Sequence, residues 1–210
     1  MDVAPHPFTS GSMDDVRVTV RYDENDIRPG LFATIHEGGH ALYEQGYLEE
    51  NYNTPLSESI SLGIHESQSR MWENMIGRSR AFWDHYYNRF QESFPTMKGI
   101  SLDDFHRDVN IVKPSLIRVE ADEVTYSMHI IVRFETELDL IEGKISVDDI
   151  PSIWNEKYEK YLGVTPPNDA LGCLQDIHWA IGAVCYFPTY SLGNLYSAQF
   201  YDTARTQIHD

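Results

Sequence analysis

The chain has 210 residues, of which 41% are hydrophobic and 12% aromatic, and this composition predicts a packed globular protein rather than a disordered acidic segment. Its 33 acidic and 16 basic side chains give a net charge of −17, so we expect no nucleic-acid partner and no anionic membrane surface, because phosphates would meet a repulsive field. Cys173 and Cys185 lack C-x-x-C spacing, and neither a membrane-length apolar run nor a leader is visible, which predicts a reduced, cytoplasmic protein.

The first predicted element is a strand over 15–24, where valines alternate with polar residues. The turn-like segment 6–12 before it is a candidate partner strand. From residue 29 onward the pattern and the cap residues predict helices. Their expected ranges are 29–46, 59–93, 102–112, 115–143 and 146–163, followed by two or three helical pieces over 170–208 that kink around Pro188. The expected fold class is mainly α, with a small antiparallel β element near the N-terminus.

The segment HEGGH at 36–40 carries the strongest chemical signal. In a helix, His36 and His40 project from one face about one turn apart, so both imidazoles can bind one cation. Glu37 is placed beside them to take a proton from a water molecule that the cation activates. The alternative is two unrelated surface histidines on an amphipathic helix, and we favour the metal site.

A catalytic zinc needs a third protein ligand and an open position. Glu44 continues the face of His36 and His40, but it lies a further turn away and fits better as a hydrogen-bond partner of a ligand. Glu66 begins the next predicted helix, which could return beside the first. Spacing alone favours it only slightly over its neighbours. The candidates considered are Glu44, Glu49, Glu50, Glu58, His65 and Glu66.

Gly38 and Gly39 separate the two histidines, and each should cost a helix interior about 1 kcal/mol relative to alanine. Glycine would let another backbone approach the metal helix, either a neighbouring helix or an extended peptide substrate. A tight helix–helix contact unrelated to the metal explains the two residues equally well.

Motifs across most of the chain occur in a fixed order: HPF at 6–8 with DVRVT at 15–19, HEGGH at 36–40, HESQ at 65–68, IRVEAD at 117–122 and GCLQDIHW at 172–179. Together they resemble the carboxypeptidase Taq family of zinc or cobalt metallocarboxypeptidases. The resemblance implies a helical, zincin-like peptidase that removes residues from peptides with a free C-terminus, usually as a homodimer. It also implies one Zn²⁺ or Co²⁺ per chain, held by His36, His40 and Glu66, with Glu37 as general base and acid.

A carboxypeptidase must recognise a free α-carboxylate, for which an arginine in a bidentate pair is the natural partner. Arg118 of IRVEAD is the first candidate. Its alternative is an ordinary helix pair with Asp122 that has no part in binding. If Arg118 does bind the substrate, Asp122 is a candidate to orient it. Arg17 of the predicted strand is the second candidate, on a strand that could also pair with an extended substrate.

The oxyanion that develops during peptide hydrolysis needs hydrogen-bond donors in addition to the metal. His178 and Tyr190 resemble the donor pair of related helical peptidases and are assigned this role, with Tyr186 as a substitute. Asp176 is a candidate to orient His178. The alternative for each ring is a buried side chain with a satisfied polar tip.

Members of the family are much longer, so the chain is expected to be a single catalytic segment over 1–210, truncated at both ends. The same zinc helix could instead serve an endopeptidase, or the segment could bind a metal or a partner protein without turnover. The aromatic stripe at 71–90 is predicted to be packing surface. No ligand spacing is found for His85, His106, His129 and His209.

Overall fold

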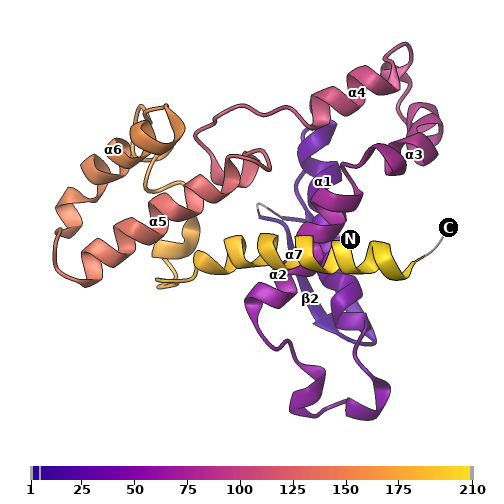
Figure 1. Ribbon diagram of the computed structural model, residues 1–210, viewed down its shortest axis with the longest axis horizontal. Helices are drawn as coiled ribbons and strands as arrows, with labels where there is room; N and C mark the ends of the chain where they lie inside the picture. Colours follow the sequence, from indigo (N-terminus) through magenta and orange to yellow (C-terminus); the bar gives the residue numbers. More distant parts are fainter. Residues whose placement is uncertain (1, 5, 209–210) are drawn as a thin grey trace. The chain divides into compact units, whose positions relative to one another are not determined.

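Helices dominate the structure, a computed structural model that describes residues 2–4 and 6–208 (Figure 1). The strands are β1 (Asp2–Val3), β2 (Phe8–Ser12) and β3 (Asp15–Val20). The α-helices are α1 (Ile27–Gln45), α2 (Leu62–Arg70), α3 (Arg80–Ser93), α4 (Leu102–Val109), α5 (Tyr126–Ile141), α6 (Ile150–Leu162) and α7 (Pro188–Gln207). Within the described residues, none of these helices combines the length and the apolar character needed to cross a membrane. The predicted fold class is confirmed.

The described chain packs as two compact units. The first unit comprises the residues through Asn110 together with those from Leu192 onward, and the second is Ile111–Ser191. Helix α7 therefore begins in the second unit and ends in the first. The expectation that 1–210 forms one catalytic segment concerns activity and stays a prediction. His209, for which the sequence showed no ligand spacing, lies outside the described residues.

The sheet of the first unit has β3 at its centre, in the order β1-β3-β2. Strand β2 is antiparallel to β3, with Phe8 opposite Thr19, which confirms the predicted pairing. Strand β1 runs parallel to β3 and was not predicted. Gly11 has φ +145° and a Cβ there would overlap the carbonyl oxygen of Asp15, so only glycine fits this position of the hairpin.

Helices α1, α3 and α4 of the first unit pack around an aromatic core. The predicted continuous helix over 59–93 is wrong, because α2 gives way to the π-helical segment η3 (Met71–Ile76) and α3 then begins anew. The local reason is Ser79, whose hydroxyl accepts a hydrogen bond from the backbone N–H of Phe82 and caps α3. The aromatic stripe does serve as packing surface, as predicted. The core consists of Phe32, Trp83, Tyr87, Phe90, Phe105 and Val109.

In the second unit α5 packs on α6. The predicted helix over 115–143 is wrong in its first part, since α5 starts only at Tyr126. The Asp122 carboxylate accepts the backbone N–H groups of Val124 and Thr125, a local turn that competes with a helix. Pro188 starts α7 instead of kinking a helix. The core consists of Val132, Ile150, Trp154, Tyr158, Leu162 and Cys173, with a second cluster of Tyr126, Ile130 and Phe187.

Acidification is expected to destabilise the second unit through His129, which is 1% exposed and hydrogen-bonded through Nδ1 to the Tyr158 hydroxyl. Burial, helped by the charge of Arg118, lowers the pKa of His129 from 6.5 to about 4. The unfolded chain therefore binds the extra proton first, and stability is lost as the pH falls from 6.5 to about 4. The loss amounts to about 3 kcal/mol for this group.

Urea unfolding of the 210-residue chain at several pH values measures this effect. The His129→Phe variant keeps the ring volume and removes the titrating nitrogens. Its free energy of unfolding should fall less steeply over the same pH interval. Equal slopes for the two proteins would contradict the assignment.

Candidate metal centre and active site

The first unit brings His36, His40 and Glu66 together, with their ligand atoms within 4.8 Å of one another. His36 Nε2 and His40 Nε2 lie 3.7 and 3.4 Å from the same oxygen of Glu66, Oε2. Ligand atoms of a tetrahedral zinc site with bonds of 2.0–2.1 Å are about 3.4 Å apart, so this donor set fits a divalent metal. Burial opposes ionisation of Glu66, but the two histidines and Arg70 outweigh it and lower its pKa, which keeps the carboxylate in the form that binds metal.

The other candidates for the third ligand occupy different places. Glu44 and His65 stand behind His40 and form hydrogen bonds there. Glu58 lines a pocket together with Glu44, and the exposed Glu49 and Glu50 lie in the short turn after α1. The geometry therefore favours Glu66, which spacing alone could not separate from its neighbours.

The two glycines of HEGGH have different surroundings. A Cβ on Gly39 would lie 2.6 Å from the Cα of Ser69 and 2.8 Å from the carbonyl oxygen of Gln68, so α2 approaches α1 at this residue. A Cβ on Gly38 would have no neighbour within 4 Å among the described residues. Gly39 thus allows the close approach of a neighbouring helix, and this helix carries Glu66 to the histidines, so the contact is connected with the metal site.

We expect opposite effects from alanine at these two positions. Gly39→Ala should reduce the free energy of unfolding by about 1–3 kcal/mol, because backbone atoms block the new methyl group. Gly38→Ala should raise it by about 0.5–1 kcal/mol, because alanine is the better helix former and the space is open. Urea unfolding of both variants measures these changes. Similar free energies of unfolding for the two variants would contradict the helix-contact explanation. A raised KM in Gly38→Ala, with stability gained, would instead indicate that a substrate passes this residue.

Glu73 supports His36 from the opposite side. Its Oε2 lies 2.9 Å from His36 Nδ1 and accepts a hydrogen bond from Arg70 Nη1 at 3.0 Å. Burial opposes the charge of Glu73, but Arg70, His36 and Arg78 hold its pKa well below the usual range. A carboxylate on the outer nitrogen of a ligating histidine fixes the ring and its tautomer. Glu73 was not predicted, although in the continuous helix expected over 59–93 its position seven residues after Glu66 would place both on one face. In the structure Glu73 belongs to the π-helical segment η3.

The Glu37 side chain is 5% exposed, and it forms a hydrogen bond with the sheet. The Thr9 hydroxyl of β2 lies 2.7 Å from Glu37 Oε2 and 2.9 Å from the Glu37 carbonyl oxygen. The strand thus positions the carboxylate that follows the first ligand in sequence. Thr9 was not predicted either, because nothing in the local sequence of HEGGH indicates a contact with a residue 28 positions earlier.

Apart from Arg17, the second unit contains the other predicted residues. Arg118 is 4% exposed and makes a bidentate ion pair with Asp176, at 3.0 Å from Nε and 2.7 Å from Nη2. Its Nη1 donates to the Tyr126 hydroxyl at 2.9 Å, and its guanidinium carbon lies 4.7 Å from the centre of the Tyr190 ring. Burial opposes the charge, but Tyr126 and Asp176 outweigh it and raise the pKa of Arg118. Asp122, the partner in the alternative interpretation of Arg118, instead accepts hydrogen bonds from its own turn.

The predicted donor pair is a hydrogen-bonded pair in the structure, with His178 Nε2 3.1 Å from the Tyr190 hydroxyl. The Tyr186 ring lies beside His178, with centroids 5.4 Å apart. Asp176 Oδ1 is 3.9 Å from His178 Nδ1, too far for a direct hydrogen bond. Arg17 belongs to the first unit, where its side chain is 77% exposed and pairs with Asp15.

Relatives of known name match almost the whole chain. It is 52% identical over 209 residues to thermostable carboxypeptidase 1 of Thermus thermophilus, covering 99% of this chain and 41% of the relative. Carboxypeptidase 1 of Bacillus subtilis is 55% identical over 201 residues, 95% of this chain and 40% of the relative. The chain therefore spans about 40% of the length of these relatives.

Solved structures agree with the sequence matches. The carboxypeptidase of Pyrococcus furiosus superposes with a TM-score of 0.95 at 46% identity, over 99% of this chain and 42% of that one. The sequence pattern of the family described as Carboxypeptidase Taq (M32) metallopeptidase matches residues 1–210. The resemblance found in the motifs is thereby confirmed, and the chain belongs to the carboxypeptidase Taq metallopeptidase family.

Proposed function

We propose that the chain is the catalytic segment of a metal-dependent carboxypeptidase, which releases C-terminal amino acids from peptides. The observation that carries the proposal is the cluster of His36, His40 and Glu66 with the buried carboxylate of Glu37 next to it in sequence. Because the chain spans about 40% of its relatives' length, the activity of the whole protein is assigned to this segment only as a proposal.

His36, His40 and Glu66 would hold one Zn²⁺ or Co²⁺ per chain, since two imidazoles and a carboxylate suit both ions. When bound, such an ion polarises the scissile carbonyl and makes water acidic enough to lose a proton near neutral pH. Glu37 is the group that takes this proton and then gives it to the leaving amine. The Thr9 hydroxyl occupies Glu37 Oε2, so we assign the proton transfer to Oε1.

His178 and Tyr190 are proposed as hydrogen-bond donors to the developing oxyanion, with Tyr186 as a substitute. Their mutual hydrogen bond keeps the two polar tips together, which supports a joint role. The ion pair of Arg118 with Asp176, which lies two residues before His178, holds this segment in place.

For the substrate carboxylate, Arg118 stays the first candidate and Arg17 the second. Asp176 accepts hydrogen bonds from Nε and Nη2 of Arg118, and the Tyr126 hydroxyl accepts one from Nη1, so a substrate would have to use the second N–H group of Nη1 or Nη2 or exchange with Asp176. Arg17 is exposed and would exchange a weaker, solvent-screened partner. A rise in KM for peptides with a free C-terminus, found in only one of Arg17→Ala and Arg118→Lys, would identify the anchor.

We also propose a homodimer in the cytoplasm. The dimer is what the family resemblance implies, and sedimentation at several concentrations tests it. The cytoplasmic location is supported by Cys173 and Cys185, which are both free.

The decisive experiment incubates the Zn²⁺- or Co²⁺-loaded chain with an unblocked peptide and its C-terminally amidated twin, followed by mass spectrometry. Stepwise loss from the free C-terminus alone is the expected result. Internal cleavage of both peptides would replace the proposal by an endopeptidase. Absence of cleavage with the metal bound would leave a segment that binds a metal or a partner protein without turnover.

A further inference from the structure

The two metal-ligating histidines are supported in different ways. His36 Nδ1 faces the carboxylate of Glu73 directly. His40 Nδ1 instead faces a second imidazole, with His65 Nδ1 at 2.6 Å. On the far side of that ring, His65 Nε2 lies 2.6 Å from Glu44 Oε1. The result is a continuous chain of side chains, Glu44–His65–His40, that ends at the candidate metal centre.

The chemistry of these groups fixes the direction of both hydrogen bonds. An ionised carboxylate only accepts, so His65 Nε2 must carry the hydrogen that it donates to Glu44. A neutral imidazole with its hydrogen on Nε2 has a lone pair on Nδ1, and His65 Nδ1 therefore accepts from His40 Nδ1–H. His40 then presents the lone pair of Nε2, which is the atom that lies 3.4 Å from Glu66 Oε2.

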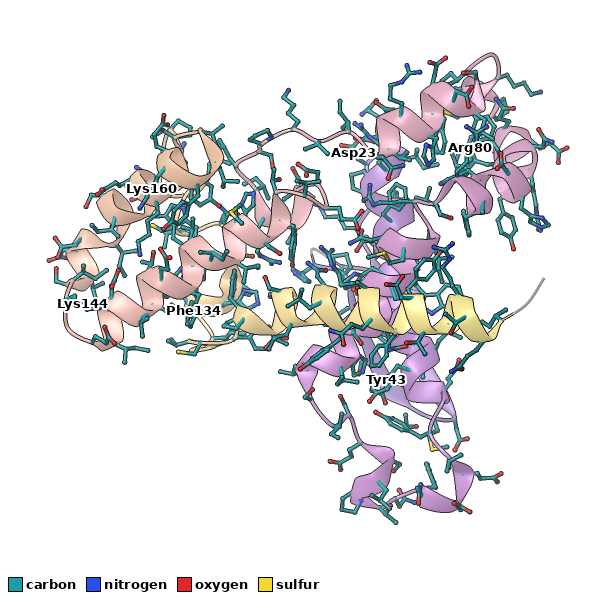
Figure 2. All side chains as sticks on the ribbon, in the orientation of Figure 1. Asp23, Tyr43, Arg80, Phe134, Lys144 and Lys160 are labelled. Carbon is teal, nitrogen blue, oxygen red and sulfur yellow. The ribbon has the colours of Figure 1, made fainter. Side chains whose placement is uncertain are left out.

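Packing holds His65, the middle member of this series of side chains, in place. His65 is adjacent to Glu66 on α2, so the same helix supplies a ligand and the partner of another ligand. The Tyr43 ring, labelled in Figure 2, lies against His65 with ring centroids 4.9 Å apart. The outer end is accessible, because Glu44 lines an open pocket of about 440 Å³ together with Glu58.

We propose that Glu44 and His65 are positioning residues for the metal centre, which set the tautomer and the ring orientation of His40 by this directed pair of hydrogen bonds. The inference rests on the proposed metal site, but it concerns hydrogen positions and metal affinity rather than hydrolysis. Glu44 acts through His65, and His65 acts through His40, so neither is a ligand.

Two variants of His65 separate this role from simple packing. His65→Phe keeps the ring shape and removes the acceptor, and Zn²⁺ affinity measured by competition with a chelator should fall about 10–100-fold. His65→Asn places a carbonyl oxygen near the former Nδ1 and so keeps an acceptor, and its loss of Zn²⁺ affinity should stay below about tenfold although its side chain is smaller. Equal losses in both variants, or unchanged affinity in His65→Phe, would overturn the proposal.

Glu44→Gln and Glu58→Gln form a second matched pair, since each removes one negative charge from the same pocket. The amide at residue 44 can donate as well as accept, so it no longer fixes the direction. Glu44→Gln should therefore weaken Zn²⁺ binding about tenfold, whereas Glu58→Gln should leave the affinity unchanged. Equal effects would show that the pocket's charge, and not the hydrogen-bond direction, is responsible.

Nitrogen-15 NMR of the histidine rings in the unchanged 210-residue chain gives a direct readout. We expect a hydrogen on His65 Nε2 and on His40 Nδ1, with Zn²⁺ absent or present. A hydrogen on His65 Nδ1 would overturn the proposal even in a chain that binds Zn²⁺ and hydrolyses peptides. Conversely, a chain with hydrogen on His65 Nε2 and His40 Nδ1 that hydrolyses no peptide would contradict the proposed function and still support this inference.

Discussion

Replacement of Glu37 by glutamine is expected to slow peptide hydrolysis by about 10²–10⁴-fold, the usual contribution of a general acid–base group. Glutamine cannot take a proton from water at neutral pH, but its carbonyl oxygen can still accept the hydrogen bond that Thr9 donates to Glu37. The fold and the three ligand side chains should therefore be undisturbed. The measurements are kcat and KM on a peptide with a free C-terminus, together with the bound metal per chain.

The matching control is Glu58→Gln, which makes the same chemical change in an exposed glutamate that lines a pocket to which Glu37 does not contribute. Its kcat should equal that of the unchanged chain. Thr9→Val is a milder change than Glu37→Gln, because it removes the hydrogen bond to the Glu37 carboxylate and keeps the carboxylate itself. If Glu37→Gln bound metal and hydrolysed the peptide at the original rate, Glu37 would not be the base.

Local sequence was sufficient for much of the metal centre. The spacing of His36 and His40 follows from helix geometry alone, and any helix containing HEGGH would place them on one face. For the third ligand, the sequence left Glu66 as one of several candidates. The contact that brings Glu66 to the histidines is the approach of α2 to Gly39, and this approach depends on tertiary packing. The motif resemblance supplied what spacing could not.

The partners that support the site were not predictable in the same way. Thr9 reaches Glu37 from a strand, a contact that depends on how the elements pack. Glu44 was predicted as a hydrogen-bond partner of a ligand, but its side chain contacts His65, 21 residues away, and His65 in turn contacts the ligand His40. In the second unit the helical period of 115–143 suggested Asp122 as the partner of Arg118. The actual partner, Asp176, is 58 residues away, and Asp122 is engaged by its own turn.

Loss of Arg118 is expected to destabilise the chain by about 3–5 kcal/mol, because Arg118→Met leaves the carboxylate of Asp176 buried without its partner. The side chains of this pair are 5% and 7% exposed. Burial opposes the charge of Asp176, but Arg118 lowers its pKa below the ordinary value. Without the arginine, burial alone raises the pKa of Asp176. The buried charge then lowers the free energy of unfolding at neutral pH, and this loss disappears as the carboxyl group is protonated.

Two comparisons test this account by urea unfolding. The difference between Arg118→Met and the unchanged chain should be largest at pH 7 and shrink as the pH falls, since protonation removes the stranded charge. The double variant with Asp176→Asn should recover a large part of the loss, because replacing both members of a buried pair costs less than removing one. Arg17→Met, which breaks only an exposed ion pair with Asp15, should leave stability unchanged. A loss in Arg118→Met that is independent of pH and not relieved by Asp176→Asn would show that Arg118 stabilises the unit by packing against Tyr190 and Phe187 rather than by its charge.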